Sequence, residues 1–423
     1  MRTFAVIWLG QLISTMGSYM THFALTLWAW EVIQSATALA LIGFFSQLLR
    51  IPVTLVAGLI VDRYSRKQLM MLGDSVVALS TIAIGLLYLT GHLQLWHLYL
   101  AAMINGGFEQ IQSLAYQTSI SLLVPPQQLI RANSMDSAVH YSAIILGPAL
   151  AGFLYQPMGL LGILLIDIVT FAIAIGTLAW ATIPQPQPQS NSALDFRFDQ
   201  LTLGLRTVWK QPNLRALLGI TGLFWFFHDL GSAIDDPMIL ARSEGSAQTL
   251  ASIAIAAGIG GVTGAILLSL WGGPKRRVNG MLAGFIGAGV SKTVFGLGRS
   301  PHIWLPSQVC SSLNFPLLGS SETAIWMEKI APEIQGRVFA ANALVLQGIS
   351  AIATLVAGPL ADQIFEPLLK LEISDNTPSH VLSSAFGAGS GAGMALLYVL
   401  CSLFMVLIGS IGFFIDRLKA VEG

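Results

Sequence analysis

Six of the ionisable side chains inside long apolar runs of this 423-residue sequence could take part in chemistry: His22, Arg50, Glu109, His228, Asp229 and Glu322. An ionisable group in an apolar environment costs free energy, so each of them is a candidate for binding a substrate or a proton. A histidine can change its charge near neutral pH, although a lone histidine in such a run more often serves packing. The sequence has no residues spaced as metal ligands, as a nucleophilic triad or as a glycine-rich phosphate loop.

Arg50 and Glu109 are the two charges that the sequence places at a common depth. Arg50 lies about twelve residues into the second apolar run and Glu109 about thirteen into the fourth. With a rise of about 1.5 Å per residue, both side chains fall near the middle of their helices. A substrate that disturbs Arg50 would favour protonation of Glu109. A proton-coupling pair and a permanent structural pair are the two interpretations that remain open.

Membrane-spanning helices must carry these residues. The sequence is 54% hydrophobic and 10% charged, whereas a soluble domain has about 25% charged residues. About 20 apolar residues span a bilayer, and twelve such runs begin near Phe4, Leu39, Leu69, Trp96, Met135, Gly159, Leu214, Leu250, Val278, Ile303, Val338 and Gly391. The sequence predicts an all-α membrane protein with twelve transmembrane helices, the first of which is too long for a cleaved signal.

The distribution of positive charge predicts the orientation of these helices. If the N-terminus is cytoplasmic, 16 of the 21 lysines and arginines fall on the cytoplasmic side, as the positive-inside rule requires. We therefore expect a multi-pass protein with both termini in the cytoplasm.

A faint internal repeat relates the two halves of the chain at an offset of 211 residues. It pairs Ser35-Ala36 with Ser246-Ala247, Arg66 with Arg277, and Gly147-Pro148 with Gly358-Pro359. This predicts two pseudo-symmetric six-helix bundles, residues 1–183 and 213–423, joined by a cytoplasmic linker at 184–212. The linker begins with alternating prolines that favour an extended backbone. It then has helical spacing of apolar residues from Phe198, which predicts an amphipathic helix on the membrane surface or a soluble connector.

The segment GLIVDRYSRK combines a charge cluster with a position between two apolar runs. Its residues Gly58, Asp62, Arg63, Arg66 and Lys67 resemble the signature between the second and third helices of major facilitator superfamily transporters, with Ser65 in place of the second glycine. The resemblance implies that Asp62 and Arg66 form a conformational latch, supported by Arg63 and Lys67. The alternative is that these charges only set the topology. The partner loop of the repeat keeps the basic residues but has Gly273 where the first copy has Asp62.

Two Gly-Pro pairs lie in the predicted fifth and eleventh helices, Gly147-Pro148 and Gly358-Pro359. Glycine allows close helix contact and proline interrupts the backbone ladder, so each pair predicts a closely packed bend. The first resembles the fifth-helix motif of the antiporter branch, which implies export, and ordinary helix packing is the alternative. The fourth helix, AAMINGGFEQ, lacks the arginine that drug-proton antiporters commonly carry there, so Arg50 would have to take its place.

The segments LVPPQQLIRAN at 123–133 and IQGRVFAANAL at 334–344 resemble the branch that contains macrolide and siderophore exporters. The resemblance implies a non-enzymatic, secondary active exporter of amphipathic small molecules in a bacterial plasma (inner) membrane. It would work by alternating access and proton-coupled antiport, with the proton gradient as energy source and no cofactor. We expect a monomer whose partners are the small-molecule substrate and the lipid bilayer, with no nucleic acid. A lysolipid flippase, a small-molecule importer and a non-transporting membrane sensor are the alternatives.

Four further expectations concern residues outside these motifs. Asp235-Asp236-Pro237 should mark the outer end of the seventh helix, and Asp167 should be peripheral. Lys292 should extend its amine toward the surface. Cys310 and Cys401 should be buried thiols that act as small hydrophobes.

Overall fold

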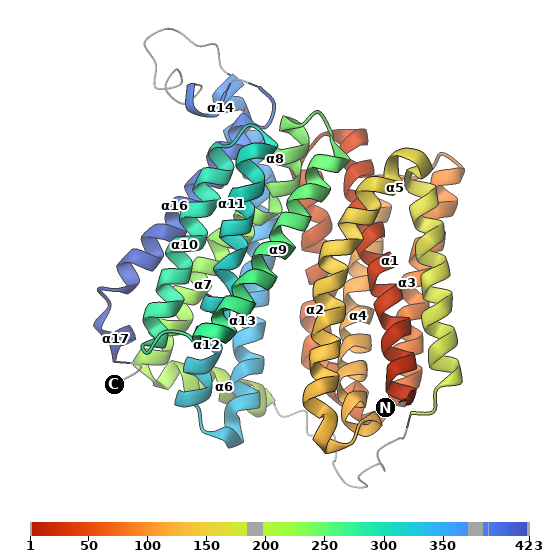
Figure 1. The fold of residues 1–423 in the computed structure, drawn as a ribbon, viewed down its shortest axis with the longest axis horizontal. Helices are drawn as coiled ribbons and strands as arrows, with labels where there is room; N and C mark the ends of the chain where they lie inside the picture. The colour runs from red at the N-terminus through yellow and green to blue at the C-terminus, as the bar shows by residue number, and fades with distance from the viewer. Residues whose placement is uncertain (1, 184–197, 371–383, 388, 421–423) are drawn as a thin grey trace. The chain divides into compact units, whose positions relative to one another are not determined.

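The computed structural model describes residues 2–183, 198–370, 384–387 and 389–420, and the regular structure in these ranges is helical. The chain divides into two compact units (Figure 1). Unit 1 comprises Met1–Gln34 and Leu41–Ser192, and unit 2 comprises Ser35–Ala40 and Ala193–Gly423. Each predicted apolar run begins within six residues of a helix end or, for the run at Gly159, at a kink inside a helix.

Unit 1 is built from four long helices together with most of α2. Its elements are α1 (Arg2–Ile33), α2 (Ala36–Arg63), α3 (Arg66–Leu89), α4 (Leu95–Leu123), the 3-10 helix η1 (Pro126–Gln128) and α5 (Leu129–Trp180). Small residues allow α1 to lie close to α5, because Gly10 faces Thr177 and Gly17 faces Thr170. Helix α5 contains both the fifth and the sixth predicted runs, since the chain turns at Gly159 (φ 63°) without a loop.

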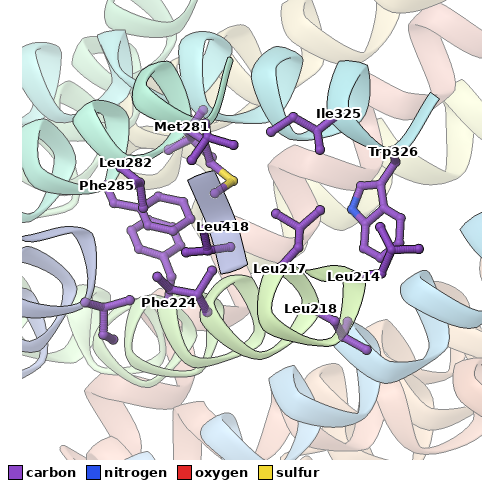
Figure 2. Close-up of a cluster of buried hydrophobic side chains, with 14 of the residues drawn as sticks. Leu214, Leu217, Leu218, Phe224, Met281, Leu282, Phe285, Ile325, Trp326 and Leu418 are labelled. Atoms are coloured by element: carbon purple, nitrogen blue, oxygen red, sulfur yellow. The ribbon is translucent and has the colours of Figure 1, made fainter. Parts of the chain in front are cut away.

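Unit 2 contains more and shorter elements. They are α6 (Phe198–Lys210), α7 (Pro212–Ala233), α8 (Asp235–Arg242), α9 (Ala247–Trp271), α10 (Arg277–Leu297), α11 (Pro301–Leu313), α12 (Phe315–Lys329), α13 (Pro332–Pro359), the π-helix η2 (Leu360–Phe365), α14 (Glu366–Lys370), α16 (Ala392–Gly412) and α17 (Asp416–Lys419). Apolar side chains of α7, α10 and α12 form its core (Figure 2). Within this core the rings of Phe224 and Phe285 stack with centroids 3.8 Å apart.

Eight helices of the described chain are long and apolar enough to cross a membrane. The difference from the twelve predicted runs has three physical causes. Helices α1 and α4 are long enough but carry many polar side chains, such as Gln11 and Gln112. Helix α5 unites two runs, and the tenth run is broken at Asn314 into α11 and α12.

The amphipathic helix predicted after the linker prolines is α6, whereas residues 184–197 of the linker lie outside the described residues. Helix α6 packs on α13, where Gly204 lies against the backbone of Arg337. Val208 is buried in the core of unit 2, while Leu205 and Trp209 are exposed. The helix is thus anchored to unit 2 by one face and keeps an apolar surface on another.

The prediction of two buried cysteines is right for Cys401 and wrong for Cys310. The thiol of Cys310 is exposed because its face of α11 is not covered within the described chain.

Candidate functional site

Two glycines of α4 bring this helix close to α2 in unit 1. Gly106 lies against the backbone of Ser46, and Gly107 lies against the side chain of Leu49. A methyl group at either position would meet these atoms, so glycine is required for the close approach. The contact lies one turn from Arg50 and Glu109 and sets the distance between them.

Arg50 and Glu109 form an ion pair, with Nη2 of the arginine 3.1 Å from Oε2 of the carboxylate. Their side chains are 32% and 46% exposed, so solvent or a ligand can reach both. The structure therefore brings together the two charges that helical rise placed at a common depth.

Uncompensated polar atoms lie one helical turn from this pair. Gln47 precedes Arg50 by three residues and Asn105 precedes Glu109 by four, which places each on the same helix face as its charged neighbour. Their amide oxygens, and Nε of Arg50, are buried without a hydrogen-bond partner in the described residues. Tyr19 of α1 interacts electrostatically with both charges. Buried polar atoms without a partner are rare in folded proteins, so they mark the surroundings of the ion pair as a candidate site.

The predicted residues of unit 2 gather on α7 and α12. Nδ1 of His228 lies 3.0 Å from Oδ1 of Asp229, and the imidazole ring is 5.0 Å from the rings of Trp225 and Phe315. Glu322 is buried and lies beside Trp225. This group combines aromatic faces with two carboxyl groups.

His22, by contrast, is isolated within the described part of unit 1. Its side chain is exposed on α1 and makes no hydrogen bond there.

The charged loop of unit 1 is held by helix ends. Ser65, which departs from the family pattern, caps α3 by accepting a hydrogen bond from the backbone of Gln68. Arg66 donates to the carbonyl of Thr118 on α4 at 2.6 Å, and Lys67 donates to the last carbonyls of α5. Asp62 and Arg63 are exposed and unpaired within the described residues, and Gly58 is exposed with open space around it.

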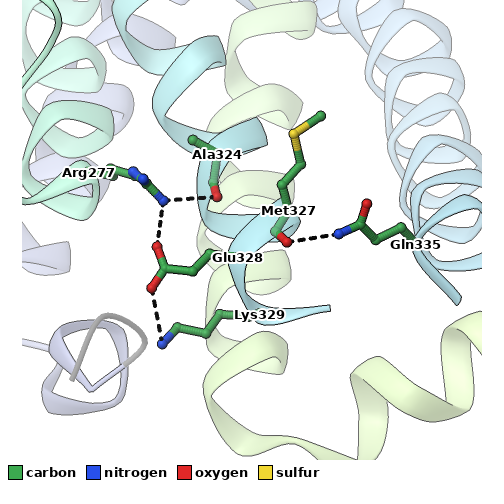
Figure 3. A network of polar contacts seen from close by, with 6 residues as sticks. All are labelled: Arg277, Ala324, Met327, Glu328, Lys329 and Gln335. Atoms are coloured by element: carbon green, nitrogen blue, oxygen red, sulfur yellow. Dashed lines mark hydrogen bonds and ion pairs between the residues drawn. The ribbon is translucent and has the colours of Figure 1, made fainter. Parts of the chain in front are cut away.

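The partner loop in unit 2 has its own acid (Figure 3). Arg277 donates to the carbonyl of Ala324 at 3.3 Å and pairs with Glu328, which also contacts Lys329 at 3.6 Å. Arg66 and Arg277 are thus related by the 211-residue offset and by their use of a neighbouring helix carbonyl. The acid differs in its position, because Glu328 lies on α12 in unit 2, whereas Asp62 lies in the last turn of α2 in unit 1. Asp62 has no partner within the described residues of unit 1, whereas Glu328 is paired within unit 2.

The two Gly-Pro pairs are sites of close helix contact. Gly147 lies against Tyr19 of α1, and α5 continues as a helix through Pro148. Gly358 lies against the backbone of Thr37, and Pro359 is the last residue of α13 before the π-helix η2.

Asp362 in η2 is a site residue that the sequence did not reveal. Its carboxylate accepts hydrogen bonds from the hydroxyl of Ser35 and from the backbone N–H groups of Ala36 and Thr37, at 2.6, 3.1 and 2.9 Å. It therefore caps the first turn of α2, where helix geometry leaves N–H groups free. The sequence signal near it was the Gly358-Pro359 pair, which ends three residues before Asp362.

Two expectations about buried charges need correction. Lys292 is 6% exposed, and its Nζ donates to the hydroxyl of Tyr398 at 3.1 Å, because α16 covers this face of α10. Asp167 is 1% exposed and accepts hydrogen bonds from Thr21 and Thr81, which line α1 and α3. The first does not reach the surface, and the second is not peripheral.

The long apolar helices and the charges that they carry are those of a helical membrane protein. A model of the Major Facilitator Superfamily matches residues 7–366, and the chain belongs to this family. It is 26% identical to macrolide efflux protein A of Streptococcus pyogenes, over 85% of this chain and 90% of that protein. It is 25% identical to the multidrug efflux pump Tap of Mycolicibacterium fortuitum, over 93% of this chain and 91% of that protein.

A solved structure of a bacterial homologue of the human lysosomal transporter Spinster shares the fold. The TM-score is 0.70 with 14% sequence identity, and the alignment covers 97% of this chain and 96% of the other. The solved structure is inward-facing and unoccupied. These comparisons place the chain in the macrolide and drug exporter branch of a transporter family.

Proposed function

We propose that the protein is a secondary active exporter of amphipathic small molecules, driven by proton entry and working by alternating access. We further propose that its twelve apolar runs all span the plasma membrane of a bacterium, with both termini in the cytoplasm. The efflux proteins to which it is similar support the direction of transport. The single observation that carries the coupling proposal is the accessible Arg50–Glu109 ion pair inside unit 1.

The geometry of the pair suggests how binding and protonation exclude one another. An arginine stays charged at any physiological pH, so the titrating partner is the carboxylate. While Glu109 is ionised, its Oε2 accepts a hydrogen bond from Arg50. A proton on Glu109 weakens this attraction and frees the guanidinium, which then has to find other acceptors. A substrate that binds to the exposed parts of the Arg50 and Glu109 side chains competes with the proton for the same groups, and this competition is the basis of exchange.

Transport into proteoliposomes with an imposed pH gradient tests the proposal. The purified protein should accumulate a substrate from a panel of amphipathic cations, macrolides and lysolipids, and accumulation should stop when a protonophore removes the gradient. Glu109→Gln should abolish accumulation while the protein stays folded. The matched control is Glu244→Gln, because Glu244 is an exposed loop acid without a partner in the described chain. Accumulation by Glu109→Gln at the wild-type rate would exclude this pair as the coupling site.

A further inference from the structure

Lys292 is an amine enclosed between two closely packed helices of unit 2. Its Nζ has one hydrogen-bond acceptor in the described residues, the hydroxyl of Tyr398, and lies 5.2 Å from the centre of that ring. Gly289 and Gly296, one turn before and one turn after it, lie against α16. The close contact of α10 with α16 keeps the Lys292 amine buried between these two helices. An enclosed ammonium is costly unless a negative charge compensates it.

The compensating charge comes from the segment where the seventh span is interrupted. Helix α7 ends at Ala233, the chain turns at Ile234, and α8 begins with Asp235. Asp235 and Asp229 are the carboxylates that interact electrostatically with Lys292, yet neither forms a direct ion pair with it in the described structure. The break thus places an acid near the amine but not in contact with it.

Asp235 has the properties of a group that exchanges a proton. It lies in the first turn of α8, where the helix dipole favours a negative charge. Its Oδ1 is buried without a hydrogen-bond partner in the described residues, so one carboxylate oxygen is unused. The residue is half-buried and the next one, Asp236, is exposed, which leaves a short distance to solvent. Interrupted helices of this kind form the ion and substrate sites of many transporters.

The remaining titratable groups near Lys292 come from α7 and α16. His228 is hydrogen-bonded to Asp229 on α7, and α16 contributes Tyr398 and Cys401. Lys292 lies five residues before the end of α10, and Tyr398 lies six residues after the start of α16. At a helical rise of about 1.5 Å per residue, the cluster is about 8–9 Å below the end of unit 2 that carries α8 (Figure 1). It is a shallow site, within reach of the medium at that end.

We propose that Asp235, with Lys292 and Tyr398, forms a second proton-exchange site of the transporter. In the empty state the Asp235 carboxylate compensates the Lys292 ammonium across the break between α7 and α8. One proton from the medium binds to the carboxylate oxygen and gives a neutral acid, so the site gains one positive charge. The ammonium then loses one of the two carboxylates that interact with it and keeps Asp229 and the Tyr398 hydroxyl. Release of the proton restores the carboxylate. The inference rests on the proposed proton-driven transport and adds the requirement that Asp235 also exchanges a proton.

Two transport assays on one preparation separate proton exchange from folding and substrate binding. Asp235→Asn should reduce pH-driven accumulation at least tenfold, because the amide cannot take up the proton. Substrate counterflow at equal pH on both sides should stay within twofold of wild type, because it needs no net proton movement. Lys292→Met and Tyr398→Phe should show the same separation with their side-chain volumes nearly kept. Glu244→Gln again serves as the matched control.

The proton itself provides a direct measurement. In weakly buffered detergent solution containing a pH indicator, substrate addition to the wild type should change the number of bound protons, and Asp235→Asn should change it by less. If Asp235→Asn fails to fold, Lys292→Met and Tyr398→Phe decide the outcome. Undiminished pH-driven accumulation in the folded variants overturns this inference alone. A wild type that transports substrate without any response to the pH gradient overturns the proposed coupling together with it.

Discussion

Replacing Gly260 with alanine should weaken unit 2, although alanine favours helices. Gly260 in α9 faces the backbone carbonyl of Val309 in α11, and an added methyl group would also lie 2.8 Å from Cβ of Ser312. A backbone carbonyl of a neighbouring helix cannot rotate away as a side chain does. One turn later, Gly264 faces the carbonyl of Leu313 in the same way. The two glycines form the surface on which α11 lies.

The expected size of the effect follows from two opposing contributions. A glycine-to-alanine change inside a helix gains about 1 kcal/mol from backbone propensity. Overpacking a close contact costs about 1–3 kcal/mol. Gly261→Ala is the matched control, because no atom lies within 4 Å of the added methyl group in the described structure. Gly260→Ala should therefore be less stable than Gly261→Ala by about 1–3 kcal/mol.

Unfolding of the purified variants in mixed detergent micelles measures this difference. The two substitutions change the same helix by the same methyl group, so the propensity contribution cancels between them. Gly264→Ala should behave like Gly260→Ala. Equal stabilities for Gly260→Ala and Gly261→Ala would refute the steric argument and the close contact of α9 with α11 on which it rests.

Two further predictions concern acids near helix ends. Asp362→Ala should cost about 0.5–2 kcal/mol, as loss of a helix cap does, and hydrogen exchange should show faster exchange at Ala36 and Thr37. The exposed Gln363→Ala is its control, and unchanged protection in Asp362→Ala would contradict the capping role. Asp62→Asn should slow the interconversion of transport states, measured by single-molecule fluorescence, without weakening substrate binding. A selective loss of binding with normal interconversion would show that Asp62 is not a latch.

Local features of the sequence predicted the helices and one contact between helices, the Arg50–Glu109 ion pair. Apolar runs depend on nearest neighbours along the chain, so their starts agree with the helix starts to within a few residues. The pairing of Arg50 with Glu109 was suggested by helical rise, because the two residues lie about twelve and about thirteen residues into their apolar runs. The kink at Gly159 also coincides with a predicted run boundary, since glycine is free to adopt the positive φ found there.

Contacts that depend on how distant helices pack were not readable from the sequence. Lys292 and Tyr398 are separated by 106 residues, and no periodicity indicates that α16 covers the lysine. The capping of α2 by Asp362 joins residues more than 300 positions apart. The environment of Asp167 also depends on distant helices, because its hydrogen-bond partners are threonines of two other helices. In each case the sequence showed a polar residue inside an apolar run but did not show which residue it contacts.

The position of Cys401 makes it a natural reporter for unit 2. Its thiol is buried on α16 and interacts electrostatically with Lys292, whereas Cys310, the second cysteine of the chain, is exposed on α11. Replacing Cys310 with serine would leave a single thiol inside the cluster, without any introduced label site. The rate at which a small alkylating reagent reaches that thiol would then measure how often α16 moves away from α7 and α10. The alkylation rate of Cys401 would thus report how often unit 2 opens around α16, without an added fluorophore or a substrate.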